Sequence, residues 1–183
     1  DSSADIFYDN TFIVDKFFHK HKFIYIEKIS KDLHGDFNKQ NIIIAYICSK
    51  ILKIKKNNFL EVVSNFKGLP YRSKVIYNNK KCTIVNNSKS TNLNSTINSI
   101  KSYENILLIL GGKAKEDNFS KLIKFKNKII CTYVYGESAS KINKSINKQI
   151  NTKKFHTIDQ LAFQLFKDIK LYNTKVTILF APA

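Results

Sequence analysis

The pattern of hydrophobic and polar positions changes once along the chain, near Gly68. Before this point, runs that alternate apolar and polar residues predict strands, and longer periodic runs predict helices. The predicted elements are strands over residues 6–8, 11–14 and 22–27 and helices over residues 42–52 and 57–66. The first helix begins near Asn41 after a polar turn, and it is apolar on most faces, so we expect it to be buried. The second ends before Gly68 and Pro70, where we place a boundary between domains of residues 1–68 and 69–183.

Beyond Gly68, strands and helices alternate, which is typical of an α/β fold with a parallel or mixed sheet. The predicted strands are residues 74–77, 82–85, 105–110, 129–135 and 176–180, and the predicted helices are residues 92–102, 119–125, 138–149 and 158–172. The last helix starts with a capping box of Thr157 and Gln160 and carries one apolar stripe, from Ile158 to Ile169. In such sheets ligands collect at the carboxyl ends of the strands. We therefore expect a site at the loops 86–91, 111–118, 136–138 and 181–183.

The composition is strongly basic, with 31 Lys and Arg against 14 Asp and Glu and a formal net charge of +17 in 183 residues. Such a charge is compatible with a surface that binds nucleic acid. The lysines are spread through the chain beside many Asn and Ile, without an aromatic stacking platform, and we favour an AT-rich coding sequence as their origin. The one arginine, Arg72, is then informative, because its planar fork can bind two oxygens at once, which lysine cannot do.

The cysteines, the histidines and the hydropathy of the chain give no sign of a disulfide, a metal site or a membrane span. Cys48, Cys82 and Cys131 lie far apart in apolar runs, so we expect buried, reduced thiols in a cytosolic protein rather than a disulfide or metal site. The four histidines have no ligand-like partners, and we predict no metal on protein side chains. No apolar run reaches the ~20 residues of a membrane span, and no signal peptide is visible. The chain has no methionine, and we expect an internal piece of a longer protein.

The strongest candidate for chemistry is the segment 86–92, NNSKSTN, between a predicted strand and a predicted helix. Hydroxyls, a cation and free backbone N–H groups at such a turn can hold phosphate or carboxylate oxygens. Taken alone, the same string is also an ordinary polar turn with a helix N-cap.

Together with LPYR at residues 69–72, this segment resembles the LPHR and NDSKATN signatures of the Mur ligase family, in its D-glutamate-adding branch. Further similarity lies in GGKAK and DNFSKL within residues 111–122, GDFNKQN at residues 35–41, GESA at residues 136–139 and APA at residues 181–183. The resemblance spans residues 35–183 and implies the end of a central ATPase domain (1–68), followed by most of a Rossmann-like C-terminal domain (69–183). No phosphate-binding loop of the G-x-x-x-x-G-K-[ST] type is present.

The resemblance also implies a reaction. ATP and Mg²⁺ would phosphorylate the carboxylate of UDP-MurNAc-L-alanine, and the amine of D-glutamate would attack the acyl phosphate. It assigns Lys89 to the reacting groups, Thr91 and Lys115 to D-glutamate, and Arg72 to the ATP phosphates. We expect the metal ligands to lie outside this chain, a monomer in the bacterial cytoplasm, and no ligase activity from these 183 residues alone.

The remaining implied contacts are with the nucleotide. Asn41 would contact the adenine edge with support from Asn38, and Asn87 would face the ribose. Asn87 stands where the family has aspartate, and Phe37 and Tyr71 stand where it has histidine, so a degenerate, non-catalytic remnant remains an alternative. A basic nucleic-acid-binding domain is the third hypothesis.

Overall fold

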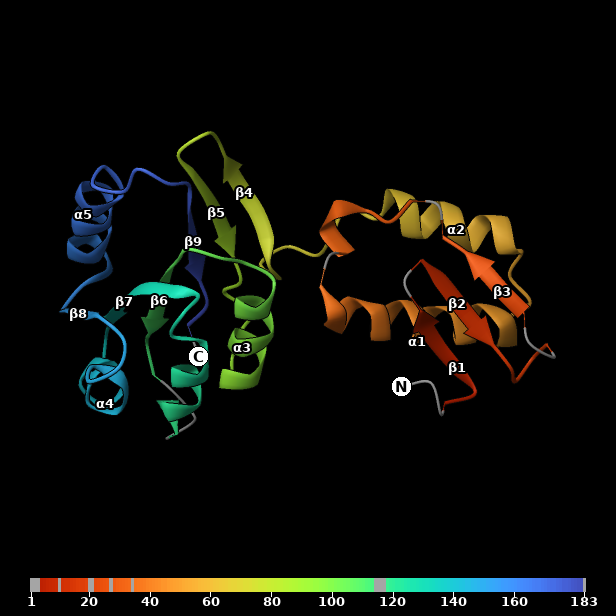
Figure 1. The fold of residues 1–183 in the computed structure, drawn as a ribbon, viewed down its shortest axis with the longest axis horizontal. Coiled ribbons are helices and arrows are strands. Elements are labelled where there is room, and N and C mark those ends of the chain that lie inside the picture. Colours follow the sequence, from red (N-terminus) through yellow and green to blue (C-terminus); the bar gives the residue numbers. More distant parts are fainter. Residues whose placement is uncertain are drawn as a thin grey trace. The chain divides into compact units, whose positions relative to one another are not determined.

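The computed structural model describes residues 4–9, 11–19, 22–26, 28–33, 35–113 and 118–182. The chain divides into two compact units, Asp1–Gly68 and Leu69–Ala183 (Figure 1). Each unit has its own hydrophobic core.

In the first unit, one face of a three-stranded antiparallel sheet packs on two helices. The elements are β1 (Ile6–Asp9), β2 (Phe12–Asp15), β3 (Lys22–Tyr25), the short 3₁₀ helix η1 (Lys31–Leu33), α1 (Asp36–Ile51) and α2 (Lys56–Asn65), with strand order β1-β2-β3. Alternate strand residues such as Ile13 and Ile24 point into the core, where they meet Tyr46 and Phe59 from the helices. The buried Asp15 carboxylate accepts a hydrogen bond of 2.6 Å from the Tyr46 hydroxyl, which ties β2 to α1.

Helix α1 differs from its prediction in two respects. It begins at Asp36, five residues earlier than Asn41. Its burial was also overestimated, because Ile44 and Ile51 are 58% and 66% exposed on the face turned away from the sheet. Cys48 is exposed as well, so the prediction of three buried thiols is wrong for Cys48 and correct for the other two.

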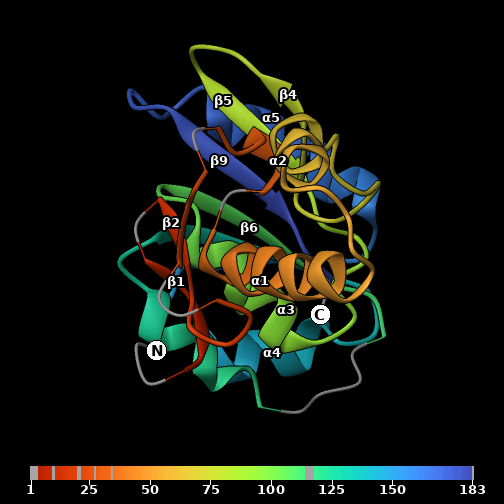
Figure 2. The same cartoon turned by 90° about the vertical axis from the view of Figure 1, so that its right-hand side faces the viewer.

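The second unit is built on a six-stranded mixed sheet, which confirms the predicted α/β class. Its strands are β4 (Lys74–Asn78), β5 (Cys82–Asn86), β6 (Ile106–Gly111), β7 (Ile129–Tyr135), β8 (Thr152–Phe155) and β9 (Val176–Phe180), in the order β4-β5-β9-β6-β7-β8. All neighbouring pairs are parallel except β4 and β5, which form an antiparallel hairpin. Strand β9 lies between β5 and β6 (Figure 2), and β8 was not predicted.

Helices cover both faces of this sheet. The remaining elements are α3 (Leu93–Lys101), the 3₁₀ helix η2 (Phe119–Phe125), α4 (Ala139–Ile146) and α5 (Ile158–Ile169). The core on one face joins α3, η2 and α4 to the sheet, and the core on the other face joins α5 to it. The predicted cap of α5 is present, since the Thr157 hydroxyl accepts from the Gln160 N–H at 3.3 Å. The predicted apolar stripe is only partly buried, because Ile158 and Phe166 are exposed.

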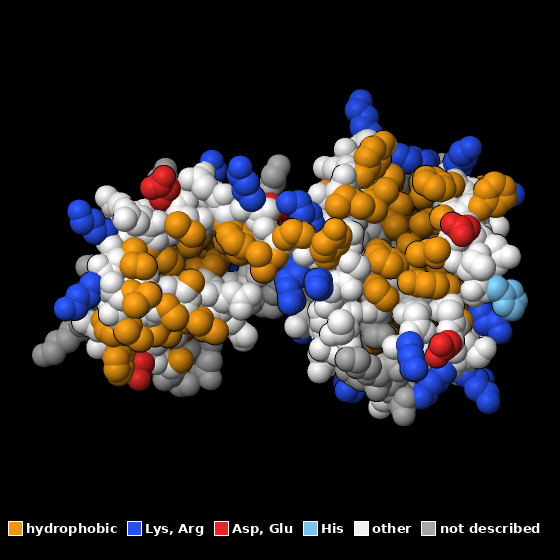
Figure 3. All heavy atoms as spheres, turned by 180° about the vertical axis from the view of Figure 1, so that it is seen from behind, with side chains coloured by type: hydrophobic (Ala, Val, Ile, Leu, Met, Phe, Trp, Pro, Cys, Tyr) orange, Lys and Arg blue, Asp and Glu red, His pale blue; other side chains and the backbone are white. Residues whose placement is uncertain are grey.

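Apolar side chains are also numerous on the surface. Figure 3 shows them gathered over part of the second unit, where exposed apolar residues occur on β4 and α5. Within the described residues, no helix has the length and apolar character needed to span a membrane.

Candidate functional site

The carboxyl ends of four adjacent strands are joined by backbone hydrogen bonds at one edge of the second sheet. The Asn87 N–H donates to the Phe180 carbonyl at 2.8 Å, which joins the ends of β5 and β9. On the other side of β9, the Ala181 N–H donates to the Ile109 carbonyl of β6 at 3.1 Å. The Gly112 N–H, directly after β6, donates to the Tyr135 carbonyl of β7 at 3.1 Å. The predicted loops after residues 86, 111, 135 and 180 therefore follow one continuous edge.

Gly111 shows why this edge needs glycine. Its φ is +147°, and a Cβ atom there would lie 2.2 Å from the Tyr135 carbonyl oxygen. Real Cβ atoms essentially never come that close to a backbone oxygen. The ends of β6 and β7 can therefore approach each other only because position 111 lacks a side chain.

The segment of residues 86–92, here called the elbow, is held by hydrogen bonds of buried hydroxyl groups. Ser90 Oγ and Thr96 Oγ1 are 2.9 Å apart, and Thr96 also donates to the Ala181 carbonyl at 3.3 Å. The Asn92 side chain caps α3 by accepting from the Ser95 N–H at 2.8 Å. Because Ser90 is buried whereas Lys89 and Thr91 are exposed, the latter two can meet a ligand and the Ser90 hydroxyl cannot.

Arg72 lies on a tight turn that is hydrogen-bonded to the elbow. Its N–H donates to the Leu69 carbonyl at 3.3 Å, which closes a turn over residues 69–72. The next contact is between the Lys89 N–H and the Tyr71 carbonyl, at 3.0 Å. The guanidinium-bearing residue and the elbow lysine are therefore on directly bonded segments, and both are exposed. The structure places these two predicted site residues together.

Asn87 occupies an interior position. Its side chain is 4% exposed, accepts from the Ser73 N–H at 3.1 Å and donates to the Ser99 hydroxyl at 2.8 Å. In this arrangement both ends of its amide are used within the chain. Its assignment to the nucleotide ribose stays a prediction.

The structure does not test whether three further predicted site residues, Lys115, Asn38 and Asn41, meet this edge. Lys115 lies outside the described residues, so its expected position near Lys89 is untested. Asn38 and Asn41 lie in the first turns of α1 in the other unit, where the Asn41 amide donates to Asn38 Oδ1 at 3.1 Å. The roles of both residues in binding adenine stay a prediction.

A buried ionic cluster on the α5 face was not found from the sequence. The Asp168 carboxylate accepts from Lys153 and Tyr133 at 2.6 Å each and from Gln164 at 2.8 Å. Burial by itself raises the pKa of Asp168, but these hydrogen bonds outweigh it and hold the pKa below its usual value. The hydrogen bond to Asp168 raises the pKa of Lys153, against the opposing effect of burial. Because all its groups are paired, the cluster fastens β8 and α5 to β7.

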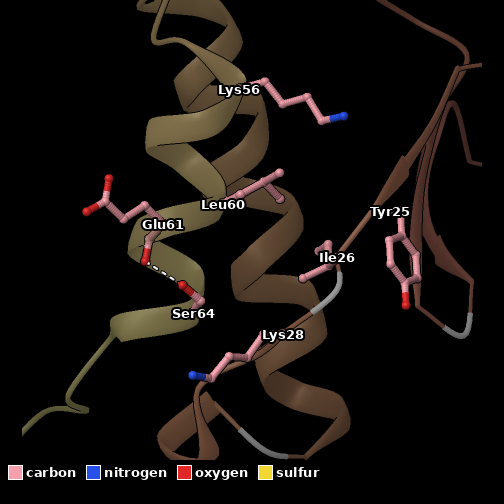
Figure 4. A pocket seen from close by; sticks show the side chains of 7 residues that line it. All are labelled: Tyr25, Ile26, Lys28, Lys56, Leu60, Glu61 and Ser64. Carbon is pink, nitrogen blue, oxygen red and sulfur yellow. Dashed lines mark hydrogen bonds between the residues drawn. The ribbon is translucent and has the colours of Figure 1, made fainter.

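A hollow in the first unit lies between α2 and the chain around the end of β3 (Figure 4). It has a volume of about 740 Å³ and is lined by Tyr25, Ile26, Lys28, Lys56, Leu60, Glu61 and Ser64. The Ser64 hydroxyl on its wall is already bonded to the Glu61 carbonyl at 2.9 Å. None of the predicted site residues lines this hollow. Among the described residues, no cluster of three His, Cys, Asp or Glu side chains is suited to a metal ion.

Comparison with known proteins gives the family. No family model matches the chain. The UDP-N-acetylmuramoylalanine–D-glutamate ligase of Prochlorococcus marinus (strain MIT 9312) is 33% identical over 159 residues, which is 82% of this chain and 33% of the relative. The enzyme of the same name from Rickettsia prowazekii (strain Madrid E) is 33% identical over 175 residues, covering 93% of this chain and 39% of the relative. The chain belongs to the Mur ligase family. It spans about a third of the length of these curated relatives.

Solved structures show the Mur ligase fold in this chain. The crystal structure of MurF from Acinetobacter baumannii matches 89% of the chain and 37% of its own length, with a TM-score of 0.69 and 15% identity. A folylpolyglutamate synthase from Mycobacterium tuberculosis matches 97% of the chain and 44% of its own length, with a TM-score of 0.60 and 10% identity. At these identities the likeness concerns the fold alone.

Sequence reasoning missed Ser73 and Ser99 as parts of this candidate site. Both contact Asn87, and their hydroxyl oxygens are 2.8 Å apart. The sequence offers a weak signal for Ser99, since it lies on the α3 face that also carries buried Thr96 and Ile100. A serine on a buried helical face needs a polar partner, and that partner is Asn87.

Proposed function

We propose that the chain is part of an ATP-dependent ligase that adds D-glutamate to UDP-MurNAc-L-alanine through an acyl phosphate, in the synthesis of peptidoglycan precursors. The names of the curated relatives support the acceptor and the amino acid. One observation carries the proposal. Exposed Lys89 lies on the elbow, and exposed Arg72 lies on the turn whose backbone is hydrogen-bonded to the elbow. Two exposed cations near the carboxyl ends of parallel strands suit a reaction in which negative charge moves between oxygens.

In the proposed reaction, the substrate carboxylate attacks the γ-phosphorus of ATP, and ADP leaves. Arg72 holds two phosphate oxygens with its planar fork, and Lys89 neutralises charge on the oxygens of the transferred group. Removal of one such preorganised donor typically raises an enzymatic barrier by roughly 3–4 kcal/mol. These groups thus bind and orient the phosphates while no covalent bond to the protein forms.

In the second step, the D-glutamate amine attacks the acyl carbon, loses a proton, and inorganic phosphate leaves. Thr91 and Lys115 would hold the carboxylates of D-glutamate so that its amine is aligned with the acyl phosphate. Such positioning converts a bimolecular encounter into an intramolecular one. Exposure of Thr91 at the elbow supports this role.

The remaining proposed contacts are with the nucleotide. Asn41 and Asn38 would read the adenine edge, and Asn87 would lie under the ribose. Mg²⁺ is expected to bind with ATP on groups outside this chain, and none of the proposed residue roles depends on it. We assign residues 1–68 to the end of the central domain and residues 69–183 to the C-terminal domain. We further assign the protein to the bacterial cytoplasm, as a monomer, and expect no turnover from the 183 residues alone.

The experiment uses the full-length enzyme with Lys115→Ala, and Lys113→Ala from the same loop as the matched control. Because Lys115 is assigned to a D-glutamate carboxylate, its loss should raise the KM for D-glutamate by about tenfold or more and leave the KM for ATP nearly unchanged. Lys113 is exposed and has no assigned ligand, so its variant should behave as the unmodified enzyme. An unchanged D-glutamate KM in Lys115→Ala would count against the assigned role.

A second candidate is a non-catalytic remnant of such a ligase. The buried, uncharged Asn87 favours it, because the family's aspartate is absent and the amide that replaces it is engaged internally. ATP binding by the full-length protein, before and after Asn87→Asp, separates the two functions. Binding near zero in both forms would support the remnant.

A further inference from the structure

We propose that Asn87, Ser73 and Ser99 form a positioning cluster that fixes the backbone of Arg72 against the elbow. The proposal rests on the proposed function, because Arg72 acts there on the phosphates of ATP. In this scheme the three residues act through Arg72, in addition to the ribose contact proposed for Asn87. They fix the backbone position from which the Arg72 side chain extends.

The cluster is a closed set of hydrogen bonds. Asn87 Oδ1 accepts from the Ser73 N–H at 3.1 Å, Asn87 Nδ2 donates to Ser99 Oγ at 2.8 Å, and the two serine hydroxyls are 2.8 Å apart. Asn87 and Ser99 are 4% and 2% exposed, so water competes little for these bonds. Their loss would leave buried polar groups unpaired, which typically costs about 1–3 kcal/mol.

Backbone strain around Arg72 explains why such a cluster is needed. Tyr71 and Ser73 have φ values of +64° and +48°, in the left-handed region that side chains other than glycine seldom adopt. Each such residue costs roughly 1–3 kcal/mol and persists only where neighbouring contacts hold it. Here the Lys89 N–H holds the Tyr71 carbonyl at 3.0 Å, and Asn87 holds the Ser73 N–H. Arg72 is therefore clamped on both sides by the elbow.

This arrangement gives Asn87 a role that differs from contact with the nucleotide. Its amide is oriented toward the turn that carries Arg72, and both of its ends are engaged there and on α3. An asparagine is suited to the task, because it offers an acceptor to a backbone N–H and a donor to a hydroxyl at the same time. Leucine is of similar size and offers neither.

The kinetic test uses the full-length enzyme with Asn87→Leu and Ser99→Ala, each alone and combined with Arg72→Ala. If the cluster acts through Arg72, each single variant should raise the KM for ATP by about threefold to tenfold and leave the KM for D-glutamate unchanged. In the Arg72→Ala background the same substitutions should add less than about twofold. The variant Asn87→Asp keeps the acceptor for Ser73 and loses the donor to Ser99, so it should raise the KM for ATP less than Asn87→Leu does. Tyr133→Phe is the control, because it also removes a buried hydrogen bond in the second unit but touches neither the turn nor the elbow.

A second measurement is independent of catalysis. In Asn87→Leu and Ser99→Ala, amide exchange should accelerate at least about tenfold at Ser73 and Lys89, while the β6 amides keep their protection. Full additivity with Arg72→Ala, or unchanged exchange at both amides, would overturn the positioning role. An unmodified enzyme without D-glutamate-dependent ATP consumption would refute the proposed function, and the exchange rates would still decide the positioning role by themselves.

Discussion

The close approach of β6 and β7 predicts that Gly111→Ala destabilises the second unit far more than Gly112→Ala does. The two glycines are adjacent at the end of β6, and both have positive φ values, +147° and +87°. An added Cβ at Gly112 meets nothing within 4 Å, whereas at Gly111 it meets the Tyr135 carbonyl oxygen at 2.2 Å and carbon Cδ1 of the same residue at 2.7 Å. The pair therefore separates backbone strain from steric overlap.

The magnitude follows from these contacts. Left-handed strain costs about 1–2 kcal/mol at either position, and the lower entropy of the unfolded alanine chain returns about 0.4–1 kcal/mol. At Gly111 the overlap adds about 1–3 kcal/mol, and the displaced Tyr135 carbonyl weakens its bond from Gly112, worth about 1 kcal/mol. We expect a loss of about 1 kcal/mol for Gly112→Ala and about 3–5 kcal/mol for Gly111→Ala.

The assay is native-state hydrogen exchange of the slowest β6 and β9 amides, which reports the free energy of unfolding the second unit without interference from the first. Thermal unfolding gives a second reading, and a loss of 3 kcal/mol in a unit of this size should lower the Tm by roughly 10 °C. Equal losses in the two variants would refute the assignment of a steric role to Gly111.

Three further predictions concern other parts of the chain. Folding holds the pKa of Asp168 below its usual value of 3.8, so the stability that its carboxylate contributes is complete above pH 3.8 and is lost as the pH falls through the lowered pKa. Urea unfolding between about pH 5 and 2 should therefore show a falling free energy of unfolding in the unmodified chain. In Asp168→Asn this free energy should depend less on pH over the same range. Tyr71→Gly should raise stability by up to about 1 kcal/mol in the same unfolding experiment, because the ring is half exposed and φ is +64°. A thiol reagent should modify Cys48 rapidly in the native chain, and Cys82 and Cys131 only after unfolding, as read by mass spectrometry.

The strands and the fold class of the second unit could be predicted, because long apolar runs such as Ile129–Tyr135 end at glycine. Strand β8 could not, since Thr152–Phe155 carries two lysines and pairs only with β7, at the edge of the sheet, where lysine is well tolerated. The place of β9 in the middle of the sheet follows from tertiary packing and leaves no mark on local periodicity.

The candidate site was predictable to a similar extent. The motif around Lys89 and the fact that Arg72 is the one arginine pointed to these two residues. In the structure a hydrogen bond from the Lys89 N–H to the Tyr71 carbonyl joins their segments. The direction of the Asn87 side chain could not be predicted, because it depends on Ser99 being carried under the elbow by α3. For the same reason the pairing of Asp168 with Lys153 was missed, since no local motif links an α5 residue to a strand before it.

The clamped turn has a mechanical consequence for the connection between the two folded bodies. Residues 71–73 are bonded to the elbow, and Gly68 is packed so closely on Asp32 that an added Cβ would lie 3.0 Å from the Cβ of that residue. Leu69 therefore stands between a closely packed glycine and a hydrogen-bonded turn, next to a proline whose φ is fixed. An amino acid inserted between Gly68 and Leu69 would lengthen this short joint and keep the bond from the Arg72 N–H to the Leu69 carbonyl.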